Sequence, residues 1–253
     1  MVVATFSKEQ FKEVSYLVES TLSGVQQNSK SNYYASFFDR DSIQQDSKTI
    51  SCSGRGQTLL FSKDRRDLVL RHYRRGGFFG KLVKDSFFIF EKNAHRAFDE
   101  FKLLEYMLSK GLPVPKPVIA REIKGFFSVT QDIVIERLNG YKDLSYVISK
   151  RELTETEYTN IGKTISLFFK ENILHTDLNI RNILINEEGM VAIIDFDKCV
   201  CTKLSKDMKI SMINRLLRSF KKEISRDLTK KIYFNESNFK FLKNKALLQK
   251  FIL

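Results

Sequence analysis

His175-Thr176-Asp177-Leu178-Asn179-Ile180-Arg181-Asn182 is a polar stretch between two apolar segments, and it decides the fold. Short apolar runs over 183–186 and 190–196 follow it, separated by the turn sequence Glu187-Glu188-Gly189. Such a pattern predicts a β-hairpin. The second run ends in Asp195-Phe196-Asp197. The sequence therefore predicts a polar loop, then a hairpin, then a carboxylate at the end of a strand.

These residue types fit the transfer of a phosphate group from ATP to a hydroxyl. The attacking hydroxyl needs an acceptor for its proton, which Asp177 can supply. Phosphate oxygens must be shielded by Mg²⁺, which prefers hard oxygen ligands. Asn182 offers an amide oxygen and Asp195 a carboxylate, while His175 would pack behind the loop. The alternative is a set of ordinary loop polars, but H-x-D-L-x-x-x-N, a hairpin and then D-F is the order at protein-kinase active centres.

The remaining pattern predicts an α+β, two-lobed fold of the protein-kinase type. The lobe at 1–139 would hold a polar extension, followed by a β-rich nucleotide lobe with one helix. The lobe at 140–253 would be mainly helical, carry the catalytic loop and begin at Gly140. Apolar alternation and helical spacing predict the elements of the first lobe: a helix around Tyr33–Asp39, strands at 51–61, 67–73, 123–129 and 132–138, and a helix over 94–110.

Arg71 stands where the lysine of the V-A-I-K motif falls in protein kinases. Its partner would be Glu100, at the edge of the apolar stripe of the 94–110 helix. The planar guanidinium group of Arg71 would hold the α- and β-phosphates of ATP. Arg74 is a rival for this role. Alternatively, Arg71 is a surface strand residue and Glu100 a solvated helix residue. Gly54 and Gly56 are expected either to cover the nucleotide phosphates or to form an ordinary β turn.

The formal net charge is +13, and residues 203–250 hold 14 Lys and Arg against 4 Asp and Glu. This excess attracts anionic partners. Within 208–227, we predict an apolar stripe with a basic face roughly opposite that is either solvated or turned toward anionic lipid. The stripe is Ile213, Leu217, Phe220 and Ile224, and the basic face is Arg215, Arg218, Lys222 and Arg226.

Other classes of protein fit the sequence less well. No apolar run approaches the roughly 20 residues needed to cross a bilayer, so a membrane contact would be peripheral. Three cysteines do not make a disulfide framework, which favours a reducing compartment. The chain shows no base-stacking or groove-reading motif, so no nucleic-acid partner is expected.

Four segments together resemble the 3-deoxy-D-manno-octulosonic acid kinase (Kdo kinase) family of Gram-negative bacteria, over roughly residues 50–220. They are LVLRHYRRGGFFGKLV (68–83), RAFDEFKLLEYMLSKGLPVPKPV (96–118), HTDLNIRNILIN (175–186) and IIDFDKC (193–199). The resemblance implies ATP-dependent phosphorylation of the 4-hydroxyl of Kdo on a lipid A precursor, at the cytoplasmic face of the inner membrane.

Carried over by residue, the resemblance makes Asp177 the catalytic base, Asn182 and Asp195 the Mg²⁺ ligands and Arg71 the phosphate contact. Asp197 stands where D-F-G has glycine, and Thr176 stands where H-R-D has arginine, so a regulated activation loop is not expected. Contact of Arg181 with an acidic sugar is a further hypothesis. Two alternatives stay open at this point: a kinase of the same fold acting on heptose, an aminoglycoside or a protein, and a noncatalytic basic binding protein.

Overall fold

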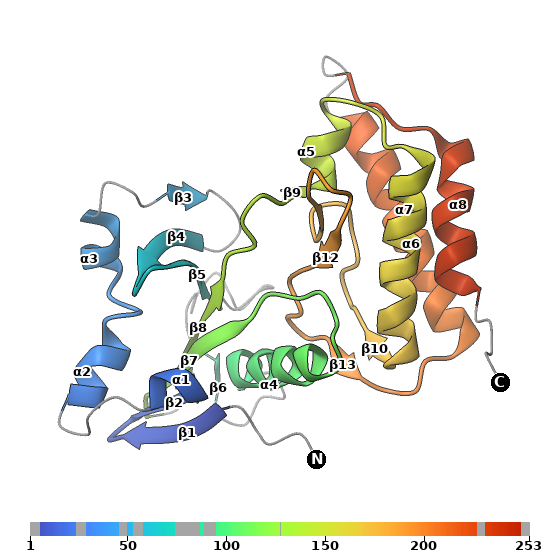
Figure 1. The fold of residues 1–253 in the computed structure, drawn as a ribbon. Coiled ribbons are helices and arrows are strands. Elements are labelled where there is room, and N and C mark those ends of the chain that lie inside the picture. The colour runs from blue at the N-terminus through green and yellow to red at the C-terminus, as the bar shows by residue number, and fades with distance from the viewer. Residues whose placement is uncertain are drawn as a thin grey trace. The chain divides into compact units, whose positions relative to one another are not determined.

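The computed structural model describes residues 6–23, 29–45, 50–52, 58–73, 87–88, 95–126, 128–226 and 231–248. The chain divides into two compact units (Figure 1). The first comprises residues 1–109 and 115–139, and the second comprises residues 110–114 and 140–253.

The first unit is built on one antiparallel sheet with the strand order β1-β2-β7-β8-β5-β4-β3, in which β6 also pairs with β8. The sheet joins strands from distant parts of the sequence, since β2 pairs with β7 and β5 with β8. The strands are β1 Phe6–Phe11, β2 Val14–Glu19, β3 Ile50–Cys52, β4 Thr58–Lys63, β5 Arg66–His72, β6 Phe87–Phe88, β7 Pro117–Lys124 and β8 Ser128–Glu136.

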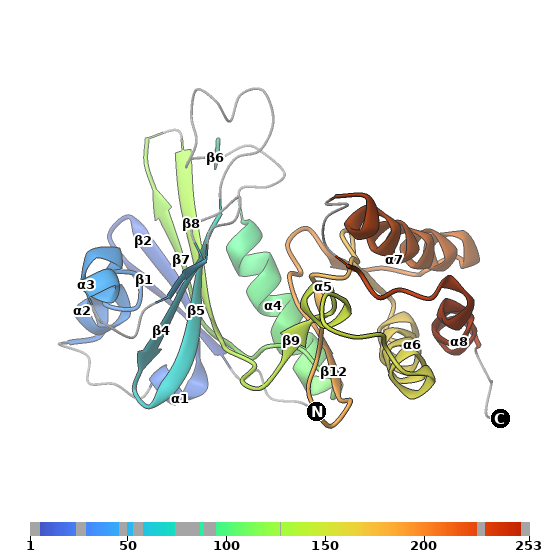
Figure 2. The same cartoon turned by 90° about the horizontal axis from the view of Figure 1, so that it is seen from above.

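Helices lie on both faces of this sheet (Figure 2). Helix α4, Arg96–Ser109, packs on β7 and β8 through one buried side that includes Phe101 and Leu104. The opposite face carries helices α2, Lys30–Ala35, and α3, Arg40–Gln45, and the short helix α1, Ser20–Ser23, follows β2. Strand β2 is consequently buried on both faces, with Tyr16 2% and Leu17 1% exposed.

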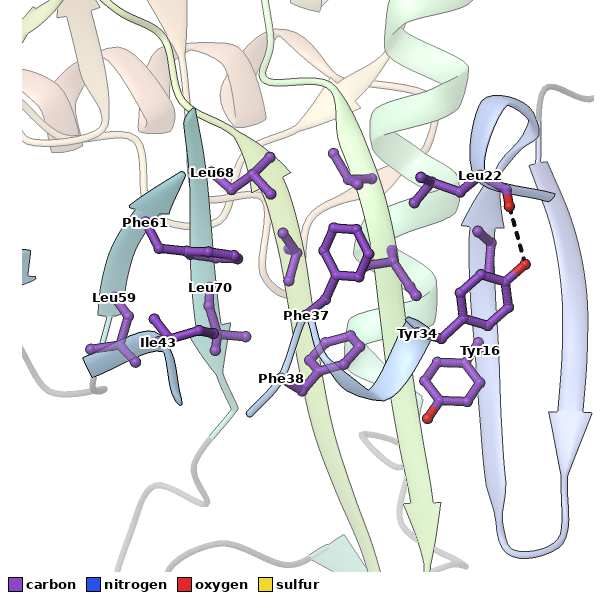
Figure 3. Close-up of a cluster of buried hydrophobic side chains, with 14 residues drawn as sticks. Tyr16, Leu22, Tyr34, Phe37, Phe38, Ile43, Leu59, Phe61, Leu68 and Leu70 are labelled. Atoms are coloured by element: carbon purple, nitrogen blue, oxygen red, sulfur yellow. Dashed lines mark hydrogen bonds between the residues drawn. The ribbon is translucent and has the colours of Figure 1, made fainter. Parts of the chain in front are cut away.

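Aromatic side chains from the N-terminal segment form the core on the α2–α3 side of the sheet (Figure 3). Tyr34, Phe37 and Phe38 are almost completely buried against strand residues such as Leu70, and the Tyr34 hydroxyl donates to the Leu22 carbonyl over 3.4 Å. Full burial of such side chains contributes about 1.5–3 kcal/mol each. The segment that composition alone presented as a polar extension is therefore part of the core of the first unit.

Three predicted elements of this unit were wrong in their bounds. The helix around Tyr33–Asp39 ends at Ala35, because Asp39 caps the next helix by accepting from the Ser42 backbone N–H over 3.3 Å. The strands predicted at 123–129 and 132–138 are instead β7 and β8. Gly125 forms the hairpin turn between them, and its N–H donates to the Ser128 carbonyl over 2.7 Å.

In its described residues, the second unit combines four helices with two small sheets, of strand order β12-β11-β9 and β10-β13. Helices α6 and α8 pack closely, because Gly162 leaves room for the backbone of α8 at Leu242. The helices are α5 Leu144–Ile148, α6 Glu155–Lys170, α7 Lys206–Arg226 and α8 Glu236–Leu247; the strands are β9 Lys142–Asp143, β10 Ile173–Leu174, β11 Ile183–Ile185, β12 Val191–Ile193 and β13 Val200–Cys201.

Helix α7 buries part of the predicted stripe, since Ile213 and Phe220 are buried as expected. Its buried residues are Met212, Ile213, Leu216 and Phe220, whereas Ile224 is 39% exposed. The prediction was wrong at Ile224, which lies one turn beyond Phe220, and Leu217 is only partly buried. Phe220 stacks on Phe234 with ring centroids 4.6 Å apart. Among the described residues, no helix is long and apolar enough to span a membrane.

Candidate active site

The polar stretch 175–182 forms a loop that begins after β10 and leads into β11. His175 anchors it from behind: the side chain is buried, Nδ1 accepts the Asp177 backbone N–H over 3.2 Å, and Nε2 donates to the Ile194 carbonyl over 3.1 Å. Burial lowers the pKa of His175, because the charged imidazolium loses its hydration. The neutral ring therefore connects the loop to the end of β12 through two hydrogen bonds.

Asp177 lies exposed on this loop, and two side-chain amides brace it. The Asn179 Nδ2 donates to both the carbonyl oxygen and the carboxylate Oδ2 of Asp177, over 3.0 Å in each case. The Asn182 Nδ2 donates to the same carbonyl over 2.9 Å. A carboxylate held in a fixed direction at the surface is suited to accept a proton from a bound hydroxyl.

The β11–β12 hairpin brings Asn182 and Asp195 to neighbouring positions. Ile183 pairs with Ile193, and the next step of the ladder is the bond from Ile194 N–H to the Asn182 carbonyl, 2.9 Å long. Because the Asn182 NH₂ group bonds to Asp177, its amide oxygen is left as the acceptor available to a ligand. Asp195 follows β12 with a φ of +67°, a conformation that costs a non-glycine residue energy and concentrates at functional sites.

The donor set of this hairpin fits a magnesium ion delivered with a nucleotide. Within the described residues, no group of three or more His, Cys, Asp or Glu side chains could hold a metal by itself. Mg²⁺ does not require such a group, because it usually binds one or two protein oxygens together with phosphate oxygens and water. The amide oxygen of Asn182 and the carboxylate of Asp195 are ligands of that kind.

Arg71 and Glu100, which the sequence paired, are in contact within the first unit. The Arg71 Nη1 donates to the Glu100 Oε1 over 2.8 Å, and the Glu100 side chain is 1% exposed. The Tyr73 hydroxyl donates to the other oxygen of Glu100. The contact of Arg71 with nucleotide phosphates stays a prediction, and Gly54, Gly56 and the rival Arg74 lie outside the described residues.

Sequence reasoning missed the attachment of the loop 175–182 to helix α7. The Ser219 Oγ accepts the Ile180 backbone N–H over 3.1 Å. Glu223 accepts Arg181 Nη2 on both carboxylate oxygens, at 3.0 Å each, and also accepts the Ser145 hydroxyl over 3.0 Å. These bonds with Arg181 lower the pKa of Glu223, although partial burial opposes the shift. No local pattern could have shown these contacts, because they join residues 39 to 78 positions apart.

Comparisons with known proteins show what this chain is similar to. The fold resembles a solved structure, "WaaP in complex with acyl carrier protein", with a TM-score of 0.54 and 13% identity over 81% of this chain and 80% of that one. Relatives named 3-deoxy-D-manno-octulosonic acid kinase include proteins of Vibrio parahaemolyticus, 41% identical over 81% of this chain and 85% of the relative, and of Haemophilus influenzae, 37% identical over 80% and 86%. A Vibrio cholerae protein of the same name is 38% identical over 72% and 77%.

The fold and these relatives define a phosphotransferase of the protein-kinase-like class with a hydroxyl acceptor. A model of the lipopolysaccharide kinase (Kdo/WaaP) family matches residues 42–243. The chain belongs to this family. The α+β kinase-like fold and the family resemblance inferred from the sequence are thereby confirmed, and kinase activity implies the use of ATP.

Proposed function

We propose that this chain is a Kdo kinase that transfers the γ-phosphate of ATP to the 4-hydroxyl of Kdo on a lipid A precursor. The observation that carries the proposal is the braced, exposed Asp177 beside Asn182 and Asp195. The acceptor is supported by the relatives named Kdo kinase, which align with most of the chain.

In this mechanism, Asp177 accepts the proton of the acceptor hydroxyl while the hydroxyl oxygen attacks the γ-phosphorus. The bond from the γ-phosphorus to the bridging oxygen breaks at the same time, and ADP leaves. Asn179 and Asn182 hold the loop so that the Asp177 carboxylate keeps one direction during the reaction. The protonated Asp177 then returns its proton to water. Neutral His175 keeps the distance between the loop and the end of β12 constant.

Asn182 and Asp195 would hold Mg²⁺, which shields the charge of the phosphate oxygens when it is bound. Arg71 would contact the α- and β-phosphates, with Glu100 holding its guanidinium in place. This second assignment rests on the resemblance to protein kinases and on the ion pair itself.

The acceptor is a membrane lipid, so the enzyme would act by peripheral contact with the anionic cytoplasmic face of the inner membrane. The basic segment 203–250 supports this contact, and on helix α8 the exposed Lys240 and Lys243 share one side. Replacing both with glutamate should weaken binding to anionic vesicles several-fold. Unchanged vesicle binding would place the contact elsewhere.

The experiment that tests the activity is the transfer of labelled γ-phosphate from ATP to Kdo-lipid A in the presence of Mg²⁺. Wild type and the Asp177→Asn variant are compared, because asparagine keeps the shape of the side chain but cannot act as a base. Label on the lipid with wild type alone is the expected result. Circular dichroism spectra of both proteins establish that the variant is folded.

Two other outcomes would change the proposal. No transfer to Kdo-lipid A, together with transfer to a heptose-containing acceptor, would keep the kinase and replace the acceptor. Full activity of the Asp177→Asn variant would remove Asp177 from its role as the base.

A further inference from the structure

Three cations on helix α7 have no ion-pair partner within the described part of the chain. They are Arg215, Arg218 and Lys222, and all three are exposed. Other cations nearby are engaged: Lys221 binds Glu236 over 2.7 Å, Arg181 binds Glu223 over 3.0 Å, and Arg226 lies 3.9 Å from the same Glu223. From Arg215 to the end of helix α7, the positive charge left uncompensated is therefore concentrated at these three side chains.

These side chains adjoin the catalytic loop. Arg215, Arg218 and Lys222 are spaced by three and four residues, so their side chains lie on one side of the helix. Ser219 follows Arg215 by four residues and precedes Lys222 by three. The hydroxyl of Ser219 accepts the backbone N–H of Ile180, inside the loop that carries Asp177. The field of Arg215 also reaches His175, at the start of the same loop, and contributes to lowering its pKa.

The three positive charges repel one another, and no carboxylate among the described residues forms an ion pair with them. Like charges three or four residues apart on a helix destabilise it by about 0.2–0.5 kcal/mol per pair. The nearest carboxylate on the helix, Glu223, already bonds to Arg181 and Ser145. A bound anion would relieve the repulsion, and guanidinium and ammonium groups are the usual partners of phosphate and carboxylate.

We propose that Arg215, Arg218 and Lys222 form the binding site for the anionic groups of the acceptor. This inference rests on the proposed function, whose acceptor carries the carboxylate of Kdo and the phosphates of lipid A. Bound there, these groups would hold the acceptor hydroxyl toward Asp177. The ligand is the acceptor itself and not the surrounding lipid head groups.

The test compares the Arg215→Gln/Lys222→Gln double variant with wild type and with Lys221→Gln. The control removes a positive charge from the same helix at a residue whose partner is on α8. The acceptor is deacylated Kdo-lipid A, which is soluble without a membrane. It keeps both classes of anionic group, the carboxylate of Kdo and the phosphates of lipid A. Its affinity is measured by calorimetry without ATP, and its KM by phosphate transfer.

We expect the double variant to bind the deacylated acceptor at least about tenfold more weakly, since each charged hydrogen bond contributes about that factor or more. The KM for the acceptor should rise by the same factor, with kcat and the KM for ATP changed less than about twofold. Lys221→Gln should match wild type. The charge-preserving Arg215→Lys/Lys222→Arg variant should recover most of the affinity.

Equal affinity of wild type and the double variant for the soluble acceptor would overturn the inference. So would a defect that appears only on anionic vesicles, because the site would then serve lipid head groups. Failure of the proposed function is a separate result: the calorimetric difference would be present, but wild type would transfer no phosphate to the acceptor.

Discussion

Replacing Gly162 with alanine tests the packing of helix α6 on helix α8. A Cβ at this position would lie 2.4 Å from the Leu242 carbonyl oxygen, 2.9 Å from the Lys245 Cβ and 3.0 Å from the Leu242 Cα. Ordinary contacts of a Cβ begin at 3.4 Å, so the helices would have to separate by about 1 Å. Backbone atoms supply two of the three contacts, and they cannot rotate away as a side chain does.

Two opposing effects determine the size of the change. Alanine favours a helix over glycine by about 1 kcal/mol. Overpacking a rigid contact costs about 1–3 kcal/mol, and a clash with backbone belongs at the upper end of this range. The net expectation is a loss of about 2 kcal/mol, or a fall in Tm of about 4–8 °C for a chain of this size.

The assay is thermal unfolding followed by circular dichroism, with Lys163→Ala as the matched control. Lys163 is the next residue of the same helix and is exposed, so its replacement should leave Tm nearly unchanged. A Tm for Gly162→Ala equal to or above that of wild type would show that α6 and α8 are not in close contact at Leu242.

Three further outcomes are expected. Arg71→Met should lower the free energy of unfolding by about 2 kcal/mol, because the buried Glu100 loses its guanidinium partner. The double variant Arg71→Met/Glu100→Gln should recover part of that loss. If this double variant binds ATP as tightly as wild type does, the contact of Arg71 with the phosphates is contradicted. Asp195→Asn should keep the fold, since asparagine tolerates a positive φ, yet reduce phosphate transfer more than about a hundredfold, as measured by label incorporation. Burial lowers the pKa of His175, so on acidification the imidazole is protonated in the unfolded chain before it is protonated in the folded one. The free energy of unfolding should therefore fall below pH 6.5, by up to about 1.4 kcal/mol per pH unit. Urea unfolding between pH 7.5 and 5.5 should show a shallower dependence for His175→Gln, and equal slopes would refute the buried neutral ring.

Features encoded locally could be predicted from the sequence. The eight residues from His175 to Asn182 carry their own loop pattern, and the hairpin after them follows from a turn sequence between two apolar runs. The helix predicted over 94–110 is α4, Arg96–Ser109. In each case, the signal and the structure span the same short stretch of chain.

Features that depend on distant partners could not be predicted. Phe37 and Phe38 occur in a segment rich in polar residues, and only the sheet formed by later strands makes them core residues. Ser219 and Glu223 look like ordinary polar positions of a helix until the loop 175–182 is placed beside them. The bounds of β7 and β8 were missed because the apolar run around Gly125 continues through the turn.

The pairing of β2 with β7 also constrains how the chain reaches its native state during synthesis. Residues 14–18 find their partners only when residues 119–123 have left the ribosome, and β8 completes the sheet later still. Until then, Tyr34 and Phe37 cannot pack against the completed sheet. Such non-local pairing slows folding and exposes apolar surface to other chains. The first unit should therefore depend on chaperones in the cell more than its small size would suggest.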